Sequence, residues 1–217
     1  MTAPAADAAR PIRPAKPIAL ALRLLKVAAV TVGLGGISLG AYSGVLIWDD
    51  NFHAVRAGVL YRSAQPSGAD LRSAAQRHGI RSVLNLRGAN PGSAWYDEEI
   101  AASRALGLVH YDYALSARRF VTGRQIGDLI AILRAAPKPL LIHCMSGADR
   151  AGLVAALYRY AVMGVSAADA DRELSLVYGH FPYLTSRTGA MDRSFWAYVR
   201  DSTAGQGDHN GQGSPPH

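Results

Sequence analysis

Residues 139–152 read Pro-Leu-Leu-Ile-His-Cys-Met-Ser-Gly-Ala-Asp-Arg-Ala-Gly and join two apolar segments through a short loop. Leu140 to Ile142 has the length of a buried strand, and Ala151 to Met163 has the length of a buried helix. A strand, a loop of small residues and a helix start form an anion cradle, because successive N–H groups converge and the helix N-terminus adds partial positive charge. We therefore expect a phosphate or sulfate group to bind in this loop.

The loop contains both a nucleophile and a clamp for the anion. Cys144 is the only cysteine of the chain, and Arg150 follows it after five intervening residues. A guanidinium at that spacing can hold two oxygens of one tetrahedral anion. The same cation and the loop amides would lower the pKa of a thiol from about 8.5 towards roughly 3.5–7.5. We expect Cys144 to act as a thiolate nucleophile and Arg150 to bind substrate, together with the loop residues Met145, Ser146, Gly147 and Ala148.

His143 to Gly152 resembles the signature loop of the cysteine-dependent protein tyrosine and dual-specificity phosphatases: His-Cys, five residues, Arg, Ser or Thr, Gly. The Asp-Arg pair is similar to a bacterial and fungal subgroup whose loop reads Gly-Lys-Asp-Arg-Thr-Gly. Residues 61–66 (Tyr-Arg-Ser-Ala-Gln-Pro) and 82–87 (Ser-Val-Leu-Asn-Leu-Arg) also resemble bacterial members. The resemblance covers about Val55 to Val199. It implies a phosphocysteine intermediate and a His143 that orders the loop or tunes the thiol.

Two residues depart from the family pattern. Ala148 replaces the lysine of the subgroup, which removes one cation. Ala151 replaces the Ser or Thr whose hydroxyl, in the family, assists thiolate departure when phosphocysteine is hydrolysed. We therefore expect slow turnover. A binding module that retains phosphate affinity without turnover is the alternative function, and a sulfurtransferase or an arsenate reductase is a more distant one.

Cleavage of a phosphate ester also needs a proton donor for the leaving oxygen. Asp112 lies 32 residues before Cys144, at a strand end, where the dual-specificity family carries its mobile acid. Asp149 lies within the loop itself, as in the Asp-Arg subgroup. The alternatives are an ordinary strand-end acid for Asp112 and a residue favoured by the helix dipole for Asp149. The sequence leaves both candidates open.

Strands and helices alternate along the rest of the chain, which predicts an α/β fold with a central, largely parallel sheet flanked by helices. Ser67 with Asp70, and Thr122 with Gln125, are typical helix-opening caps. The predicted strands are 59–62, 80–86, 109–113 and 140–142. The predicted helices are 67–79, 95–106, 122–136, 151–163, 166–179 and 188–200. In such a fold the ligand binds at the carboxyl ends of the strands, where the Cys144 loop lies.

The N-terminal part has a different character. Residues 1–26 carry five basic groups and one acidic group, and residues 27–48 carry no charge. Twenty-two helical residues would span roughly 33 Å, against about 30 Å for the hydrocarbon core of a bilayer. We expect a single transmembrane helix over 27–48, with a cytoplasmic segment over 1–26 and a catalytic domain, 49–201, on the other side. In a Gram-negative bacterium this is the inner membrane and the periplasm. A cleaved signal peptide is the alternative.

Gly36, Gly40 and Gly44 share one face of the predicted membrane helix, a spacing that permits close helix pairing and hence a homodimer. Residues 202–217 are rich in Gly, Gln, Asn, Ser and Pro and predict a disordered tail. No cluster of His, Cys, Asp and Glu has metal-ligand spacing, so we expect neither a metal nor another cofactor.

Other residues that could suggest a site have simpler interpretations. The adjacent acids Asp97, Glu98 and Glu99 indicate a solvated helix start. His180 is interpreted as structural, and Arg118 and Arg119 either meet a second anionic group of the substrate or are solvated. Positive charge is concentrated near the N-terminus, and no aromatic and basic residues interleave, so nucleic acid is not an expected partner. We expect phosphorylated protein, phospholipid or inositol phosphate as substrate.

Overall fold

The computed structural model describes residues 21, 23–36, 50–183 and 186–210, with the backbone alone for 205–210. It divides into two units, 1–42 and 43–217. In the first unit, residue 21 and residues 23–36 are helical, and the apolar side chains of this helix are exposed. No helix within the described ranges is long and apolar enough to cross a membrane. Residues 37–48 of the predicted membrane helix, with Gly40 and Gly44, lie outside those ranges.

The second unit is built on a five-stranded sheet of order β1-β2-β5-β3-β4. The pairs β2–β5, β5–β3 and β3–β4 are parallel, and only β1 runs antiparallel to its neighbour. This confirms the predicted α/β class with a largely parallel sheet. The strands are β1 (His53–Arg56), β2 (Leu60–Ser63), β3 (Ser82–Asn85), β4 (Val109–Asp112) and β5 (Leu140–His143).

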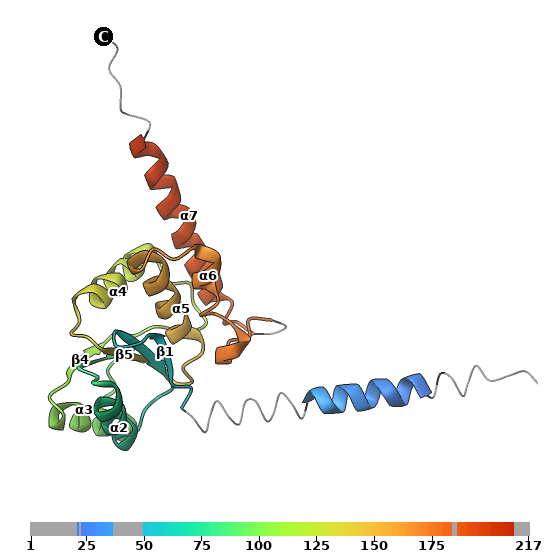
Figure 1. Ribbon diagram of the computed structural model, residues 1–217, viewed down its shortest axis with the longest axis horizontal. Coiled ribbons are helices and arrows are strands. Elements are labelled where there is room, and N and C mark those ends of the chain that lie inside the picture. Colours follow the sequence, from blue (N-terminus) through green and yellow to red (C-terminus); the bar gives the residue numbers. More distant parts are fainter. Residues whose placement is uncertain (1–20, 22, 37–49, 184–185, 211–217) are drawn as a thin grey trace, which may run out of the picture. The chain divides into compact units, whose positions relative to one another are not determined.

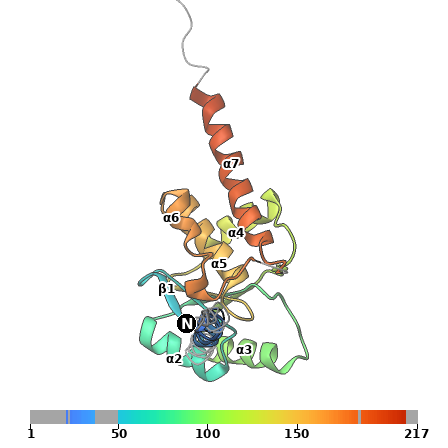
Figure 2. The same ribbon diagram turned by 90° about the vertical axis from the view of Figure 1, so that its right-hand side faces the viewer.

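Helices cover both faces of the sheet. Helices α2 and α3 lie on one side, and α4, α5, α6 and α7 lie on the other (Figures 1 and 2). Their bounds are α2 (Gly68–His78), α3 (Ala94–Ala105), α4 (Gly123–Ala135), α5 (Asp149–Leu157), α6 (Ala167–Asp171) and α7 (Ala190–Asn210). A π-helical turn, η1 (Tyr158–Val162), continues α5, and a 3-10 turn, η2 (Leu176–Tyr178), follows α6.

The two predicted capping boxes are confirmed. The Ser67 hydroxyl accepts from the Asp70 backbone and the Asp70 carboxylate accepts from the Ser67 backbone, while Thr122 and Gln125 make the same exchange. Helix α2 ends at Gly79, which has a φ of 66°, as a left-handed C-cap requires. Such caps are strong local signals, because they supply hydrogen-bond partners to backbone groups at the helix ends that otherwise lack them.

The buried core is divided between the two faces of the sheet. The larger cluster includes Leu60, Leu84 and Ile142 and packs against α4, α5 and α7, whereas Tyr61, Val83 and Leu141 belong to the smaller cluster beneath α2. Adjacent strand residues alternate between the two clusters because strand side chains point to opposite faces. Strand β5 is buried throughout because it lies in the centre of the sheet, as its apolar run predicts.

Two helix predictions differ from the structure. The helix expected from 166 to 179 ends at Asp171, and the chain reaches Gly179 through the separate turn η2. Helix α7 continues to Asn210, so the predicted disorder from residue 202 is wrong for residues 202–210. The hydroxyls of Ser202 and Thr203 bond to the carbonyl of Val199 within this helix. Adding residues to a helix that is already packed costs little, because each gains a hydrogen bond.

Candidate active site

The loop between β5 and α5 gathers the predicted nucleophile and anion-binding residues in one turn. The preceding strand is anchored by the Leu86 amide, which donates to the His143 carbonyl at 2.9 Å. Cys144 is buried, with 1% of its surface exposed, whereas Met145 is 69% exposed. The candidate nucleophile therefore lies at the base of the loop and Met145 lies at its rim.

Gly147 lies where no other residue fits. Its φ is 72°, and a Cβ built on it would lie 2.7 Å from the backbone nitrogen of Ala64 and 2.7 Å from the carbonyl carbon of Ser63. Neither backbone atom can yield as the end of a flexible side chain would. The loop therefore lies directly against the end of β2, and glycine is what permits that approach.

Arg62, on β2, holds the loop from beneath and was not singled out by the sequence. Its Nη2 donates to the carbonyls of Gly147 at 2.7 Å and Ala148 at 3.0 Å. Its Nη1 donates to the carbonyl and a carboxylate oxygen of Glu173, both at 2.9 Å, and the guanidinium lies 4.1 Å from the centre of the Tyr178 ring. Burial lowers the pKa of Arg62, and the charge of Glu173 opposes that effect.

The carbonyls of residues 145–148 all accept hydrogen bonds from donors outside the loop. Besides the two bonded to Arg62, the Met145 carbonyl accepts from the Gln65 backbone at 3.3 Å and the Ser146 carbonyl accepts from Asn51 Nδ2 at 2.9 Å. In a trans peptide the N–H points opposite to the preceding carbonyl. The amides of residues 146–149 are therefore turned away from these donors. Within the described residues, the N–H groups of Ser146, Gly147 and Ala148 donate to no protein acceptor.

Arg150 lies at the first turn of α5. Its Nη1 donates to the carbonyls of Leu86 and Leu115, both at 3.3 Å, and its Nε is buried without a partner. Among the residues that the structure describes, Arg150 forms no ion pair. A guanidinium held by carbonyls alone keeps its full charge and spare donors, which suits the binding of an anion.

Asp149 is paired with a buried histidine, His180. Its Oδ1 lies 2.6 Å from Nδ1 of His180, whose Nε2 lies 2.9 Å from Oδ2 of Asp192 on α7. Burial lowers the pKa of His180, but the hydrogen bonds to the two aspartates outweigh it and raise the pKa to about 9. The buried imidazolium thus pairs with Asp149, consistent with the structural interpretation of His180.

Asp112 ends β4 and has different neighbours. Its carboxylate accepts from Asn85 Nδ2 at 2.8 Å and from the Tyr96 hydroxyl at 2.6 Å. Asn85 is in register with both Asp112 and His143, so the three lie in one row across the carboxyl ends of the strands. Strand spacing places Asp112 about 10 Å from His143. The hydrogen bond to Asp112 raises the pKa of Tyr96 to about 12.

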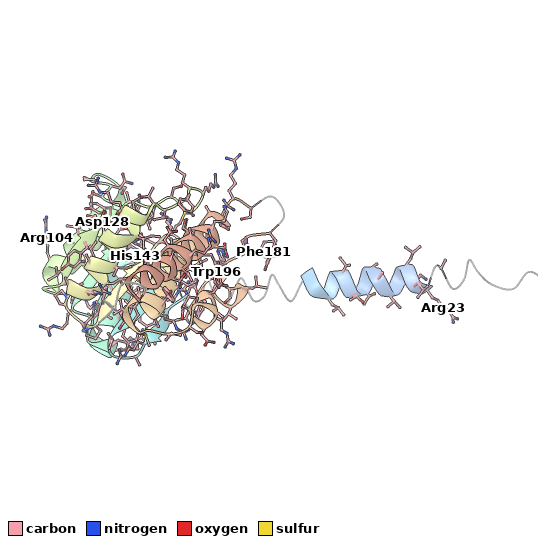
Figure 3. All side chains as sticks on the ribbon, turned by 90° about the horizontal axis from the view of Figure 1, so that it is seen from above. Arg23, Arg104, Asp128, His143, Phe181 and Trp196 are labelled. Atoms are coloured by element: carbon pink, nitrogen blue, oxygen red, sulfur yellow. The ribbon has the colours of Figure 1, made fainter. Side chains whose placement is uncertain are left out.

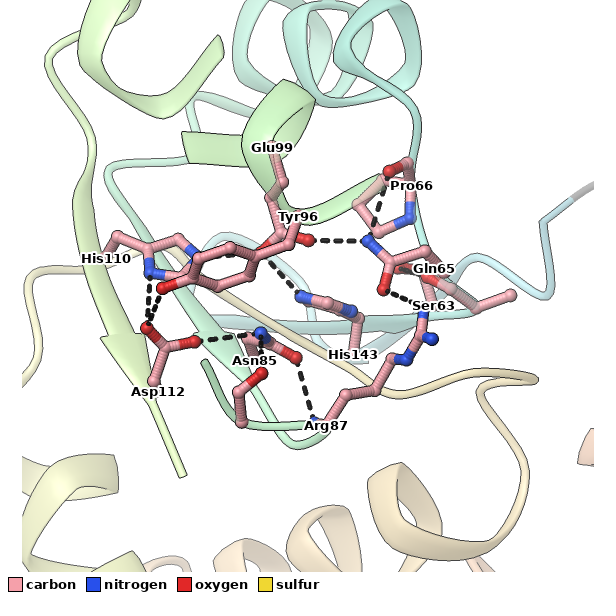
Figure 4. A network of polar contacts seen from close by, with 12 residues as sticks. Ser63, Gln65, Pro66, Asn85, Arg87, Tyr96, Glu99, His110, Asp112 and His143 are labelled. Atoms are coloured by element: carbon pink, nitrogen blue, oxygen red, sulfur yellow. Dashed lines mark hydrogen bonds and ion pairs between the residues drawn. The ribbon is translucent and has the colours of Figure 1, made fainter. Parts of the chain in front are cut away.

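A buried carboxylate, Glu99 of α3, connects the elements around this row (Figure 4). Its Oε1 lies 2.9 Å from His143 Nε2 and 2.6 Å from His110 Nε2, and its Oε2 accepts from Gln65 Nε2 at 2.5 Å. Burial raises the pKa of Glu99, but the hydrogen bonds from His110 and His143 prevail and bring it to about 2. Glu99 therefore fixes the histidine that precedes Cys144.

The interpretation of Asp97, Glu98 and Glu99 as a solvated helix start is wrong for Glu99. Asp97 and Glu98 are exposed, but Glu99 is 1% exposed because its side chain faces the sheet. The only sequence signal for this difference is helix geometry, since consecutive residues point in different directions. Arg118 and Arg119 are exposed. Figure 3 shows another exposed arginine, Arg104, extending outward from the second unit. No group of three metal-ligating side chains occurs within the described ranges.

The chain is similar to known proteins in sequence and in fold. The profile of the tyrosine phosphatase family matches residues 39–177. TpbA of P. aeruginosa has a similar structure, with a TM-score of 0.53 and 26% identity over 70% of this chain and 85% of that chain. The catalytic domain of the S. cerevisiae PP-IP phosphatase SIW14 has a TM-score of 0.52 and 19% identity over 70% of this chain and 93% of that chain. PTPMT1 has a TM-score of 0.53 and 13% identity over 70% of this chain and 99% of that chain.

A comparison with curated proteins finds no match. The family profile covers well over half of the chain, and the structural neighbours share its fold. The chain therefore belongs to the tyrosine phosphatase family, whose members are cysteine-based phosphatases.

Proposed function

We propose that the chain is a membrane-anchored phosphatase that hydrolyses phosphate monoesters through a phosphocysteine at Cys144. One observation carries this proposal. The carbonyls of residues 145–148 accept hydrogen bonds from donors outside the loop, so the N–H groups that follow them point away from those donors. Cys144 begins that loop and Arg150 follows it, so nucleophile, amides and guanidinium belong to one turn. Such a turn binds the three equatorial oxygens of a phosphoryl group in transfer.

The reaction takes two steps. The Cys144 thiolate forms the S–P bond while the P–O bond to the alcohol breaks, and a carboxylic acid gives its proton to the departing oxygen. Water then attacks phosphorus, the S–P bond breaks, and thiolate and inorganic phosphate are released. Splitting one displacement into two lowers the barrier of each.

We assign the proton donor to Asp112. The competing candidate, Asp149, is engaged in an ion pair within the fold, because its Oδ1 lies 2.6 Å from Nδ1 of His180, whose pKa is raised to about 9. Asp112 accepts hydrogen bonds from the Asn85 amide and the Tyr96 hydroxyl, and its histidine neighbour is farther away, with His110 Nδ1 at 3.7 Å from Oδ2. It is also followed by the loop whose Leu115 carbonyl contacts Arg150.

The substrate class is proposed at the level of phosphate monoesters, either phosphorylated protein or a phosphoinositide-like compound. Among the neighbours, TpbA has been crystallised with pTyr, and SIW14 is described as a PP-IP phosphatase. For this chain we propose a single-pass anchor at 27–48 in a bacterial inner membrane, a periplasmic catalytic domain, and a homodimer through Gly36, Gly40 and Gly44. The support is the uncharged run that follows a basic segment.

The test is phosphate release by the full chain in detergent, with phosphotyrosine, phosphoserine and phosphothreonine peptides, phosphoinositides and inositol phosphates as substrates. The matched variant is Cys144→Ser, which keeps the size of the side chain and removes the thiolate. We expect release from at least one substrate and its loss in the variant. If neither protein releases phosphate while inorganic phosphate still binds, the chain is a binding module, with Ala148 and Ala151 as the suspected cause.

A further inference from the structure

A second arginine, Arg87, lies beside the Cys144 loop and is not used by the reaction described above. It directly follows Leu86, whose carbonyl accepts from Arg150 Nη1 at 3.3 Å. On its other side, Arg87 Nη1 donates to Gln65 Oε1 at 2.9 Å, and the Gln65 backbone donates to the Met145 carbonyl at 3.3 Å. Arg87 is thus connected to the beginning and the end of the loop by separate contacts.

The Arg87 side chain is held in one orientation. Its guanidinium lies over the Trp95 ring, 3.5 Å from the ring centre. Gln65, its hydrogen-bond partner, is itself held by Glu99, and Figure 4 shows Arg87, Gln65 and Glu99 in one network. A stacked guanidinium with a fixed partner loses little further freedom when it binds a ligand.

The charge near this position is unbalanced. Within the part of the chain that the structure describes, neither Arg87 nor Arg150 forms an ion pair with a carboxylate, and Glu99 shares its charge with His110 and His143. Burial and then the like charge of Arg150 lower the pKa of Arg87, whereas Glu99 and Cys144 raise it. Arg87 makes a single side-chain hydrogen bond, through Nη1, and its other donors have no acceptor among these residues.

We propose that Arg87 forms a second anion site next to the Cys144 loop, and that the substrate carries a further phosphate beside the one that is cleaved. This inference rests on the proposed function, because Arg150 and the loop amides hold the first phosphate. A substrate with a single phosphate would leave the fixed guanidinium of Arg87 without a phosphate to bind. A ring with neighbouring phosphates, either as a soluble inositol phosphate or as a lipid headgroup, supplies both anions.

The test measures binding rather than turnover. The full chain in detergent is titrated by calorimetry with inositol 4-phosphate and with inositol 4,5-bisphosphate. A charge-assisted hydrogen bond contributes about 10- to 100-fold in affinity, so we expect the bisphosphate to bind more tightly by that factor. Arg87→Gln should remove most of the difference. Arg81→Gln is the matched control, because Arg81 is exposed and precedes β3 whereas Arg87 follows it, and it should keep the difference.

Equal affinity for the two compounds in the parent protein would overturn the proposal, as would an equal loss for both compounds in Arg87→Gln. Arg87→Lys provides a second variant if the glutamine variant does not fold. Lysine keeps the charge but lacks the planar fork, so a reduced preference supports the proposal and an unchanged preference contradicts a site shaped for the guanidinium. Vesicles containing the 4,5-bisphosphate lipid, compared with the soluble compound, distinguish the two sources.

The two proposals can fail separately. A bisphosphate preference that depends on Arg87, without phosphate release from any substrate, would support the second anion site and refute the phosphatase activity. Phosphate release that depends on Cys144, without a bisphosphate preference, would support the activity and refute the second site.

Discussion

Nη2 of Arg62 lies 2.7 Å from the Gly147 carbonyl oxygen, so a fully buried cation on β2 orients the loop that contains the candidate nucleophile. The same guanidinium pairs with Glu173, which is 3% exposed. Arg62 thereby joins β2, the Cys144 loop and the segment after α6. The shape of the loop depends on a side chain that lies on a different strand.

Arg62→Met should destabilise the protein and remove phosphate affinity. Deleting one partner of a buried ion pair leaves the other charge uncompensated and costs about 3–5 kcal/mol. Arg159 also contacts Glu173, at 3.1 Å, and will offset part of that cost. The measurement is the free energy of unfolding in urea. Arg72→Gln, an exposed change on α2, should stay within about 0.5 kcal/mol. Equal stability of the two variants would show that Arg62 does not support the loop.

Gly147→Ala should abolish phosphate release, because the added Cβ would lie 2.7 Å from backbone atoms of Ser63 and Ala64. Gly79→Ala is the control. Gly79 has a similar φ of 66°, but no atom lies within 4 Å of an added Cβ. The Gly79→Ala substitution should therefore lower the free energy of unfolding only by the roughly 1–2 kcal/mol that a left-handed conformation costs, and should leave activity intact. Kinetics and thermal unfolding of both variants separate steric contact from backbone strain. Retained activity in Gly147→Ala would contradict the described loop.

Asp112→Asn should reduce turnover by roughly 10²–10⁴-fold and remove the basic limb of the pH–rate profile, because the leaving oxygen loses its proton donor. Tyr96→Phe removes one hydrogen bond to Asp112 and keeps the carboxyl group, so the basic limb should remain. Asp149→Asn should keep the limb as well. A basic limb that persists in Asp112→Asn and disappears in Asp149→Asn would reverse the assignment.

His180 makes stability depend on pH. Its pKa is about 9 in the folded protein, above the ordinary 6.5, so its stabilising contribution is complete below pH 6.5 and is lost as the pH rises through 9. The loss should be on the order of 2–3 kcal/mol. Asp192→Asn removes one of the two negative charges that pair with His180 and should make the decline smaller. Urea unfolding at several pH values gives the comparison, and parallel curves for the two proteins would rule out this role of His180.

Local signals in the sequence predicted much of the fold. The caps at Ser67 and Thr122 and the apolar run before Cys144 act over a few residues, and each appears where expected. The end of α6 and the extension of α7 were not predictable in this way. They depend on packing between distant segments, such as the contact of Tyr160 with Ser202.

The candidate site was also predictable only where its residues are close in sequence. The Cys144 loop is contiguous, so its residues could be named from their spacing. Arg62 and Glu99 lie 82 and 45 residues before Cys144 and reach the loop only through the sheet and α3. A buried arginine within a short strand and a single buried acid among exposed ones have no local signature.

Cys144 is the proposed nucleophile, and trapping the phosphocysteine intermediate tests that role most directly. The full chain would be mixed with a substrate that it turns over, quenched in acid within milliseconds to seconds, and digested for mass spectrometry. We expect the peptide that contains Cys144 to gain one phosphoryl group, with a matching burst of released alcohol, because Ala151 lacks the hydroxyl that would assist the second step. Turnover with an unmodified Cys144 peptide at every time point, or turnover that survives in Cys144→Ser, would contradict the account.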